Sequence, residues 1–222
     1  MRAMAAAMSA KEVSIATSGT PTLQGSLDVA AGARGLVLFA HGSGSSRFSP
    51  RNTFVARQLR EAGLGTLLFD LLTEAEERID DETRELRFDI PLLTERLIAA
   101  TRWAQTQSPL RSLPIGYFGA STGAAAALCA AARVASVRAV VSRGGRPDLA
   151  GADLARVRAA TLLIVGGHDP DVVLLNRQAL AQLTCTARLE VVPGATHLFE
   201  EPGTLELVAS LAADWFAEHL GG

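Results

Sequence analysis

The stretch that decides the fold reads Leu113-Pro-Ile-Gly-Tyr-Phe-Gly-Ala-Ser-Thr-Gly-Ala-Ala-Ala-Ala-Leu128. Its apolar run 115–118 predicts a short buried strand, and its Ala-rich continuation 122–134 predicts a helix, since neither proline nor a further glycine interrupts it. Between them, Gly119-Ala-Ser121-Thr-Gly123 has the G-x-S-x-G spacing of a strand that turns sharply into a helix. The sequence therefore predicts an exposed Ser121 hydroxyl above a sheet.

The residue types in this turn suit a nucleophile. Strained backbone at Ser121 brings neighbouring residues close, and only glycine at 119 and 123 leaves room for them. The start of the helix places the backbone N–H of Thr122 where it can stabilise a developing oxyanion. The alternative is a glycine-flanked turn in which Ser121 only caps the helix.

Length and composition indicate one globular α/β domain. The chain has 222 residues, of which 48% are hydrophobic and 20% charged, and its net charge of −2 gives no bias toward nucleic acid or an anionic membrane. Cys129 and Cys185 have neither metal-binding nor redox spacing, so a reducing cytoplasm is expected. We expect a monomer or homodimer that acts on a small molecule.

Residues 1–8, Met-Arg-Ala-Met-Ala-Ala-Ala-Met, resemble a very short signal sequence. They are too few and too weakly apolar for one, and the charged pair Lys11-Glu12 follows directly. We expect a tail, with Met4 or Met8 as alternative starts. No apolar run approaches the roughly 18 residues that a membrane span needs.

Apolar runs alternate with helical patterns along the rest of the chain. This order predicts a three-layer α/β/α sandwich over 1–222, with a mostly parallel sheet and an antiparallel N-terminal hairpin. The expected strands are 13–17, 23–29, 35–40, 65–70, 115–118, 137–142, 161–165 and 187–192. Ser49 and Asp89 are expected to cap two of the helices.

Segment 73–89 differs from its surroundings because it holds eight acidic residues against three arginines. We interpret it as an excursion above the sheet, either a small lid that borders the active site or a solvated surface loop.

Polar residues follow the predicted strands, and the carboxyl ends of parallel strands are where sites form. Ser121, Asp169 and His197 occur in the order nucleophile, acid, base, which predicts a triad in which the imidazole takes the serine proton and the carboxylate orients the imidazole. Asp171 and Asp148 are rivals for the acid, although each could instead cap the segment beside it.

The loop His41-Gly-Ser43-Gly is the second expected oxyanion donor, through the backbone N–H of Ser43. His41 is expected to shape this loop rather than react. A plain Gly/Ser connector is the alternative, and the phosphate-loop spelling G-x-x-x-x-G-K-[ST] is missing.

Four arginines, Arg47, Arg51, Arg143 and Arg146, are expected in loops at the same end of the sheet. Arg47, Arg143 and Arg146 are candidate substrate-binding residues, since guanidinium groups pair with a carboxylate or phosphate. Alternatively, these arginines neutralise the acidic segment 73–89.

Taken together, the HGSGSS loop, GASTG, GGHDPDVV and PGATH resemble the α/β-hydrolase superfamily and, within it, the dienelactone hydrolase-like group. The resemblance covers nearly the whole length and implies neither a metal nor an organic cofactor. The resemblance implies a cysteine at the turn in true dienelactone hydrolases, so Ser121 argues against dienelactone itself as the substrate.

The function expected from these residues is a serine hydrolase that cleaves a small ester, lactone or thioester through an acyl-enzyme on Ser121. The short lid and few aromatic residues argue against a long-chain lipase. Two alternatives remain open: a non-catalytic binding protein on a hydrolase scaffold, and cofactor-free peroxidation by the same three residues.

Overall fold

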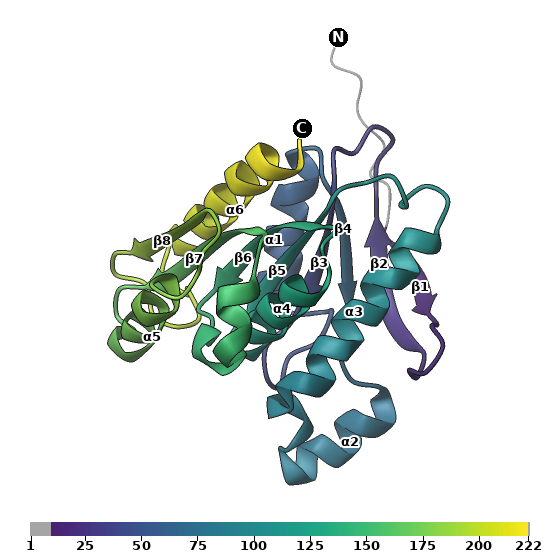
Figure 1. Cartoon of the computed structure of the whole chain (residues 1–222), viewed down its shortest axis with the longest axis horizontal. Helices are drawn as coiled ribbons and strands as arrows, with labels where there is room; N and C mark the ends of the chain where they lie inside the picture. The colour runs from purple at the N-terminus through teal and green to yellow at the C-terminus, as the bar shows by residue number, and fades with distance from the viewer. Residues whose placement is uncertain (1–9, 222) are drawn as a thin grey trace.

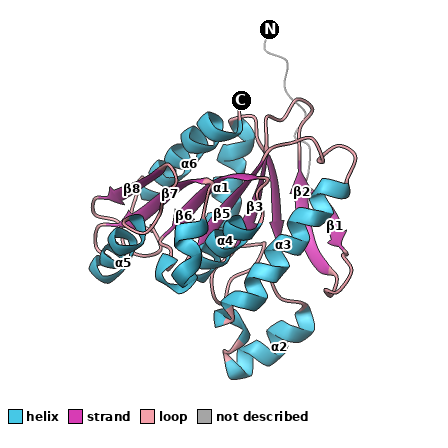
Figure 2. Ribbon diagram, viewed as in Figure 1, coloured by secondary structure: helices cyan, strands magenta, loops and turns pink. Residues whose placement is uncertain are grey.

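A computed structural model of the chain describes residues 10–221, so the expectations for residues 1–8 fall outside the described part. Its centre is an eight-stranded sheet in the order β1-β2-β4-β3-β5-β6-β7-β8 (Figures 1 and 2). Strands β4, β3 and β5 to β8 run parallel, whereas β2 is antiparallel to both β1 and β4. The predicted fold class is confirmed.

The strands follow the predicted runs closely, with the clearest differences at their ends. Their bounds are β1 Lys11–Ile15, β2 Leu23–Asp28, β3 Leu36–Ala40, β4 Gly65–Phe69, β5 Ile115–Ala120, β6 Val137–Arg143, β7 Ala160–Gly166 and β8 Ala187–Val192. The first strand begins two residues before the prediction, because pairing with β2 sets its register from Lys11 opposite Leu27 to Ile15 opposite Leu23.

Helices cover both faces of this sheet, and Figure 1 shows α3 and α4 in front of it with α1 behind. The helix bounds are α1 Pro50–Glu61, α2 Glu74–Thr83, α3 Ile90–Thr106, α4 Thr122–Arg133, α5 Pro170–Leu180 and α6 Thr204–Leu220, with 3₁₀ helices η1 Leu86–Phe88 and η2 Pro147–Arg156. The two predicted caps are confirmed, since the Ser49 side chain accepts from Asn52 N–H and that of Asp89 accepts from Leu92 N–H.

Each sheet face has its own hydrophobic core. One core lies under α3, α4 and η2, with the partly buried Trp103 packed against it. The other lies under α1 and α6 and includes Phe216 and Trp215. Because central strands such as β3 are buried on both faces, their near-continuous apolar sequence is the expected one.

The acidic segment 73–89 folds into α2 and η1 rather than an irregular loop. Thr73 and Glu76 form a capping box in which each side chain accepts a hydrogen bond from the other's backbone N–H. Glu76 also binds Arg96 of α3 at 2.6 Å, which ties α2 to the main body. In Figure 1, α2 projects away from the layer that α3 and α4 form.

The helices between residues 10 and 221 are all too short or too polar to cross a membrane.

Candidate active site

Ser121 occupies a strained turn between β5 and α4. Its φ of 50° and ψ of −119° are unusual for a residue with a side chain, and its hydroxyl makes no hydrogen bond to the first turn of α4. The capping alternative for Ser121 is therefore wrong, and the hydroxyl has no such role in the helix. A Cβ on Gly119 would lie 2.5 Å from Ala124 Cα, and one on Gly123 would lie 2.2 Å from the Ala40 carbonyl oxygen.

His197 and Asp169 form a direct hydrogen-bonded pair. The His197 Nδ1 lies 2.6 Å from Asp169 Oδ2, and their side chains are 39% and 18% exposed. If Nδ1 carries the proton and donates to the carboxylate, Nε2 is left as the basic atom. Both residues follow strands of the same sheet, His197 after β8 and Asp169 after β7.

In the described part of the chain, neither rival acid forms a hydrogen bond or ion pair with His197. Asp171 is exposed in the first turn of α5, one residue beyond Pro170. Asp148 accepts two hydrogen bonds from the Arg146 guanidinium at 2.8 and 2.7 Å and lies inside η2, so the expectation that it caps this segment is wrong.

The turn after β6 lies against both Ser121 and His197. The Ser121 N–H donates to the Arg143 carbonyl, and the Ser121 carbonyl accepts from Arg146 N–H. A Cβ on Gly144 would lie 3.6 Å from His197 Nδ1. Among residues 10–221, no hydrogen bond joins the Ser121 hydroxyl to the His197 ring, a contact that commonly tightens only when substrate binds.

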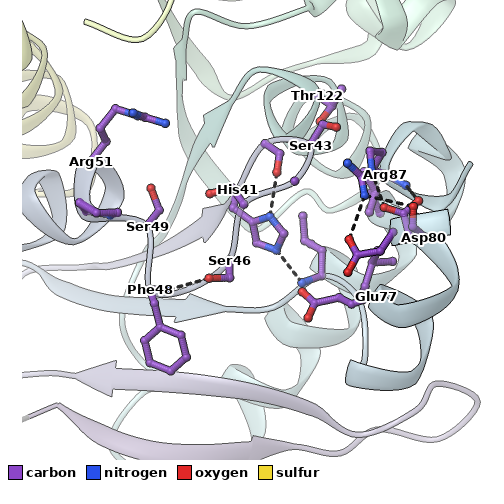
Figure 3. Close-up of a pocket in the computed structure, with 18 residues that line it drawn as sticks. His41, Ser43, Ser46, Phe48, Ser49, Arg51, Glu77, Asp80, Arg87 and Thr122 are labelled. Atoms are coloured by element: carbon purple, nitrogen blue, oxygen red, sulfur yellow. Dashed lines mark hydrogen bonds and ion pairs between the residues drawn. The ribbon is translucent and has the colours of Figure 1, made fainter. Parts of the chain in front are cut away.

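The two expected oxyanion donors, Ser43 and Thr122, line the same cavity of about 520 Å³ (Figure 3). The loop that carries Ser43 passes close to the nucleophile turn, since a Cβ on Gly42 would lie 3.1 Å from Ser121 Cβ. The loop that lines this cavity therefore passes beside Ser121.

His41 holds this loop in place. Its Nε2 accepts a hydrogen bond from Leu71 N–H at 3.0 Å, and its Nδ1 lies 3.0 Å from the Gly42 carbonyl oxygen. Burial lowers the pKa of His41, against smaller opposing effects of the Gly42 carbonyl and Asp70. A neutral ring is also what the accepting Nε2 requires.

Segment 73–89 forms part of the cavity wall, through Glu77, Asp80, Asp81 and Arg87. Arg87 bonds Asp80 through its backbone N–H and its guanidinium, and also reaches Asp81. Burial acts to raise the pKa of Asp80, but the hydrogen bonds from Arg87 outweigh it and the pKa is lowered. Burial, reinforced by Asp70, raises the pKa of Glu77.

The candidate substrate-binding arginines differ in their partners. Arg47 pairs with Asp70 and Glu12, and Arg146 pairs with Asp148, so both are engaged within the chain. None of these carboxylates belongs to segment 73–89, so Arg47 and Arg146 do not neutralise it by direct pairing.

Arg143 and Arg51 are not in loops, which corrects the sequence prediction. Arg143 is the last residue of β6, because the pairing with β5 continues to Ala120, and it is buried. Arg51 lies in the first turn of α1. Burial, and then the charge of Arg51, lowers the pKa of Arg143 to about 10.

Comparison with known proteins identifies the family. The sequence profile of the dienelactone hydrolase family matches residues 34–219. The chain belongs to the dienelactone hydrolase family. A dienelactone hydrolase from Anabaena variabilis, known from a crystal structure, is 55% identical in sequence to this chain. The match covers 96% of this chain and 99% of that protein, and the two structures superimpose with a TM-score of 0.92. Both the family and the Anabaena variabilis structure support an enzyme of the hydrolase type.

More distant structures share the fold of this dienelactone hydrolase family member. The esterase domain of a Rhodothermus marinus protein is 19% identical with a TM-score of 0.76, covering 96% of this chain and 100% of its own.

A curated relative from Mycobacterium tuberculosis is 60% identical over 214 residues, which are 96% of this chain and 47% of that protein. It carries the provisional name of a phosphoribosyl transferase. The chain therefore spans about half the length of the curated relatives it matches.

Two features of the site were not visible in the sequence. The pairing of Arg47 with Asp70 joins residues 23 positions apart, and the cavity wall at Arg87 depends on how α2 folds back. The capping-box spelling at Thr73 and Glu76 was the available signal that segment 73–89 contains a helix.

Proposed function

We propose that this chain is a serine hydrolase that cleaves a small ester, lactone or thioester through an acyl-enzyme on Ser121. The observation that carries the proposal is the His197–Asp169 hydrogen bond of 2.6 Å, together with the strained backbone of Ser121, whose hydroxyl does not cap the helix α4. The family supports hydrolysis, and the polar cavity lined by Ser43 and Thr122 suits a small acyl group.

The proposed reaction has two halves. In the first, Ser121 Oγ attacks the carbonyl carbon while His197 Nε2 takes its proton, and the oxyanion is held by the N–H groups of Ser43 and Thr122. The leaving alcohol or thiol departs with that proton. In the second half, water gives a proton to His197, attacks the acyl carbon and releases the acid, and Ser121 regains its proton.

Asp169 keeps its charge throughout. Its carboxylate orients the imidazole and stabilises the imidazolium that forms in each half-reaction. A serine nucleophile requires this base more strongly than a cysteine would, because a hydroxyl is far less acidic than a thiol. The relative from Anabaena variabilis, described as a dienelactone hydrolase, supports a lactone among the substrates to be tried.

The transferase name of the mycobacterial relative is not carried to this chain. The name belongs to a protein of which this chain matches only 47%.

The test is covalent labelling with a fluorophosphonate, read by intact mass and by peptide mapping. We expect one label on Ser121, no label on Ser121→Ala, and normal labelling of the exposed control Ser108→Ala. Hydrolysis of p-nitrophenyl acetate should fall by at least about a thousandfold in Ser121→Ala. Equal turnover by wild type and Ser121→Ala would instead favour the non-catalytic scaffold.

A further inference from the structure

Asn176 of α5 reaches the turn 143–146 that follows β6, here called the β6 turn, through a buried hydrogen bond. The residue is 0% exposed, and its Nδ2 donates to the Gly145 carbonyl at 3.0 Å and to the Val172 carbonyl at 2.8 Å. Because both partners are acceptors, the amide nitrogen is the group that must face them.

The other end of this amide has a cost. The Asn176 Oδ1 is sealed from solvent without a hydrogen bond to any residue in the range 10–221. A buried acceptor without a partner is unfavourable, and an apolar side chain of similar size would avoid it. Packing of α5 alone therefore does not explain an asparagine here, whereas the bond to the β6 turn does.

The β6 turn contacts both the proposed nucleophile and the proposed base. The Ser121 N–H donates to the Arg143 carbonyl at 3.2 Å, and the Arg146 N–H donates to the Ser121 carbonyl at 3.1 Å. Gly144 has a φ of 51°, and a Cβ on it would lie 3.0 Å from the His197 carbonyl oxygen. A shift of this turn would therefore change how Ser121 and His197 lie relative to each other.

Gly145 is the point where the β6 turn meets the helix α4. A Cβ on Gly145 would lie 2.0 Å from Ser142 Oγ and 2.6 Å from Ala124 Cβ, so only a glycine fits. Ala124 belongs to the first turn of α4, the helix that Ser121 directly precedes. The hydrogen bond from Asn176 thus holds the backbone that packs closest to the nucleophile's helix.

The helix that carries Asn176 also carries the proposed acid. Asp169 directly precedes α5, and its side chain makes no cap hydrogen bond but binds His197 Nδ1 at 2.6 Å. Asn176 follows seven residues later, which is close to two helical turns, so the two side chains lie on the same side of α5. One helix therefore holds both the acid and the β6 turn.

We propose that Asn176 is a positioning residue for hydrolysis, because it fixes the β6 turn to α5 and so sets the separation of the Ser121 hydroxyl from the His197 ring. This inference rests on the proposed function. Transfer of the serine proton depends steeply on that separation. Asn176 acts through the backbone of Gly145, and other residues line the cavity at Ser43.

Two substitutions test the role of this amide. The hydroxyl of Asn176→Ser can still donate to the Val172 carbonyl within α5 but is too short to reach Gly145, whereas Asn176→Leu loses both bonds. We expect kcat for p-nitrophenyl acetate, measured per folded molecule, to fall by roughly 10- to 100-fold in both variants. KM should stay at the wild-type value, since the cavity wall is intact.

Thr101→Val is the matched control. Thr101 of α3 is 0% exposed and donates to the Leu97 carbonyl at 2.9 Å, so this variant also loses a buried side-chain hydrogen bond and should keep the wild-type kcat. The midpoint of the kcat–pH profile should not move in the Asn176 variants, because the bond between Asp169 and His197 remains. A shifted midpoint, or an equal loss of kcat in Thr101→Val, would overturn the proposal.

Amide hydrogen exchange follows the β6 turn without any assay of activity. In Asn176→Ser, the N–H groups of Gly144 and Arg146 should exchange about tenfold faster than in wild type, while those of β3 should not change. Unchanged exchange in the β6 turn would overturn the proposal. If Asn176→Leu does not fold, Asn176→Ser decides the question, since it keeps the bond within α5.

The two proposals fail in different ways. Turnover that is unaffected by Ser121→Ala would contradict the proposed function, and the role of Asn176 with it. Turnover that depends on Ser121 but continues at the wild-type rate in both Asn176 variants would overturn the role of Asn176 alone.

Discussion

At the scale of single residues, two residues at the site lack hydrogen bonds that side chains in their positions usually make. Ser121 directly precedes α4 without capping it through its hydroxyl, and Arg143, the last residue of β6, has no hydrogen-bond partner for its buried Nε and Nη1 among residues 10–221. His197 has the opposite arrangement, since Asp169 fixes its Nδ1 and leaves Nε2 available. Both exceptions to the usual local rules of folding lie beside the proposed reaction centre.

The Asp169–His197 hydrogen bond makes a direct prediction. In Asp169→Asn the amide cannot hold the ring in the tautomer that leaves Nε2 basic, so kcat for p-nitrophenyl acetate should fall by roughly three to four orders of magnitude. The protein should remain folded by circular dichroism. Asp171→Asn, which changes an exposed carboxylate two residues away, should keep wild-type turnover; an equal loss in both variants would contradict the assignment of Asp169.

His41 predicts a pH dependence of stability. Burial lowers its pKa from 6.5 in the folded chain, so between that lower pKa and about 6.5 the unfolded chain binds more protons. The free energy of unfolding should therefore decrease as pH falls below about 6.5, where the hydrogen bond from Leu71 N–H competes with protonation of Nε2. Chemical denaturation at several pH values measures this slope.

The slope should be shallower in His41→Gln, whose amide oxygen can accept from Leu71 N–H but does not titrate in this range. His168→Gln serves as the control because His168 is exposed, and it should keep the wild-type slope. A wild-type slope in His41→Gln would assign the pH dependence to other groups.

At the scale of elements, the helix α2 is attached to the body by a few polar contacts rather than by a broad apolar face. Asp80 is the buried residue of α2, and its ion pair with Arg87 joins α2 to η1 within segment 73–89. Glu76 adds a contact with Arg96 of α3. Because α2 contributes Glu77, Asp80 and Asp81 to the cavity wall, its local stability should affect substrate binding.

Asp80→Asn tests this attachment. Loss of the charge-assisted bonds to Arg87 should lower the local opening free energy of α2 by about 1–3 kcal/mol, and so speed amide hydrogen exchange of residues 74–88 by roughly 10- to 100-fold. Exchange in β5 should not change. Asp81→Asn is the control, since the Asp81 side chain is 80% exposed and its pairing with Arg87 is weaker; faster exchange in both variants alike would refute the role of Asp80.

At the scale of the whole molecule, one continuous sheet lies between two separate hydrophobic cores. Trp103 packs on the core under α3 and α4, and Trp215 is buried in the core under α1 and α6, where its Nε1 donates to the Ala160 carbonyl. The same central strands contribute side chains to both cores. Loss of either helical layer should therefore expose the sheet and destabilise the other layer.

These two tryptophans allow a test of cooperativity. In Trp103→Phe the fluorescence reports the layer of α6, and in Trp215→Phe it reports the layer of α3. Within each variant, the fluorescence midpoint in urea should coincide with that from far-ultraviolet circular dichroism, as expected of a single cooperative unit. Fluorescence and circular dichroism midpoints that differ in either variant would show that the two layers unfold separately.

The sequence by itself determined the layered sheet, the position of the strained turn at Ser121, and the order of Ser121, Asp169 and His197 along the chain. These follow from local signals: apolar runs fix strands, glycines fix close approaches, and helix caps mark where helices begin. The helix in segment 73–89 also had such a signal, in Thr73 and Glu76.

Only the tertiary structure decided which charged groups meet. It paired Arg47 with Asp70 and Arg146 with Asp148, joined Asp169 to His197, and buried Arg143. The physical reason is that a charge interacts with whatever lies within a few ångströms in space, and that distance depends on how strands and helices from separate parts of the chain pack together.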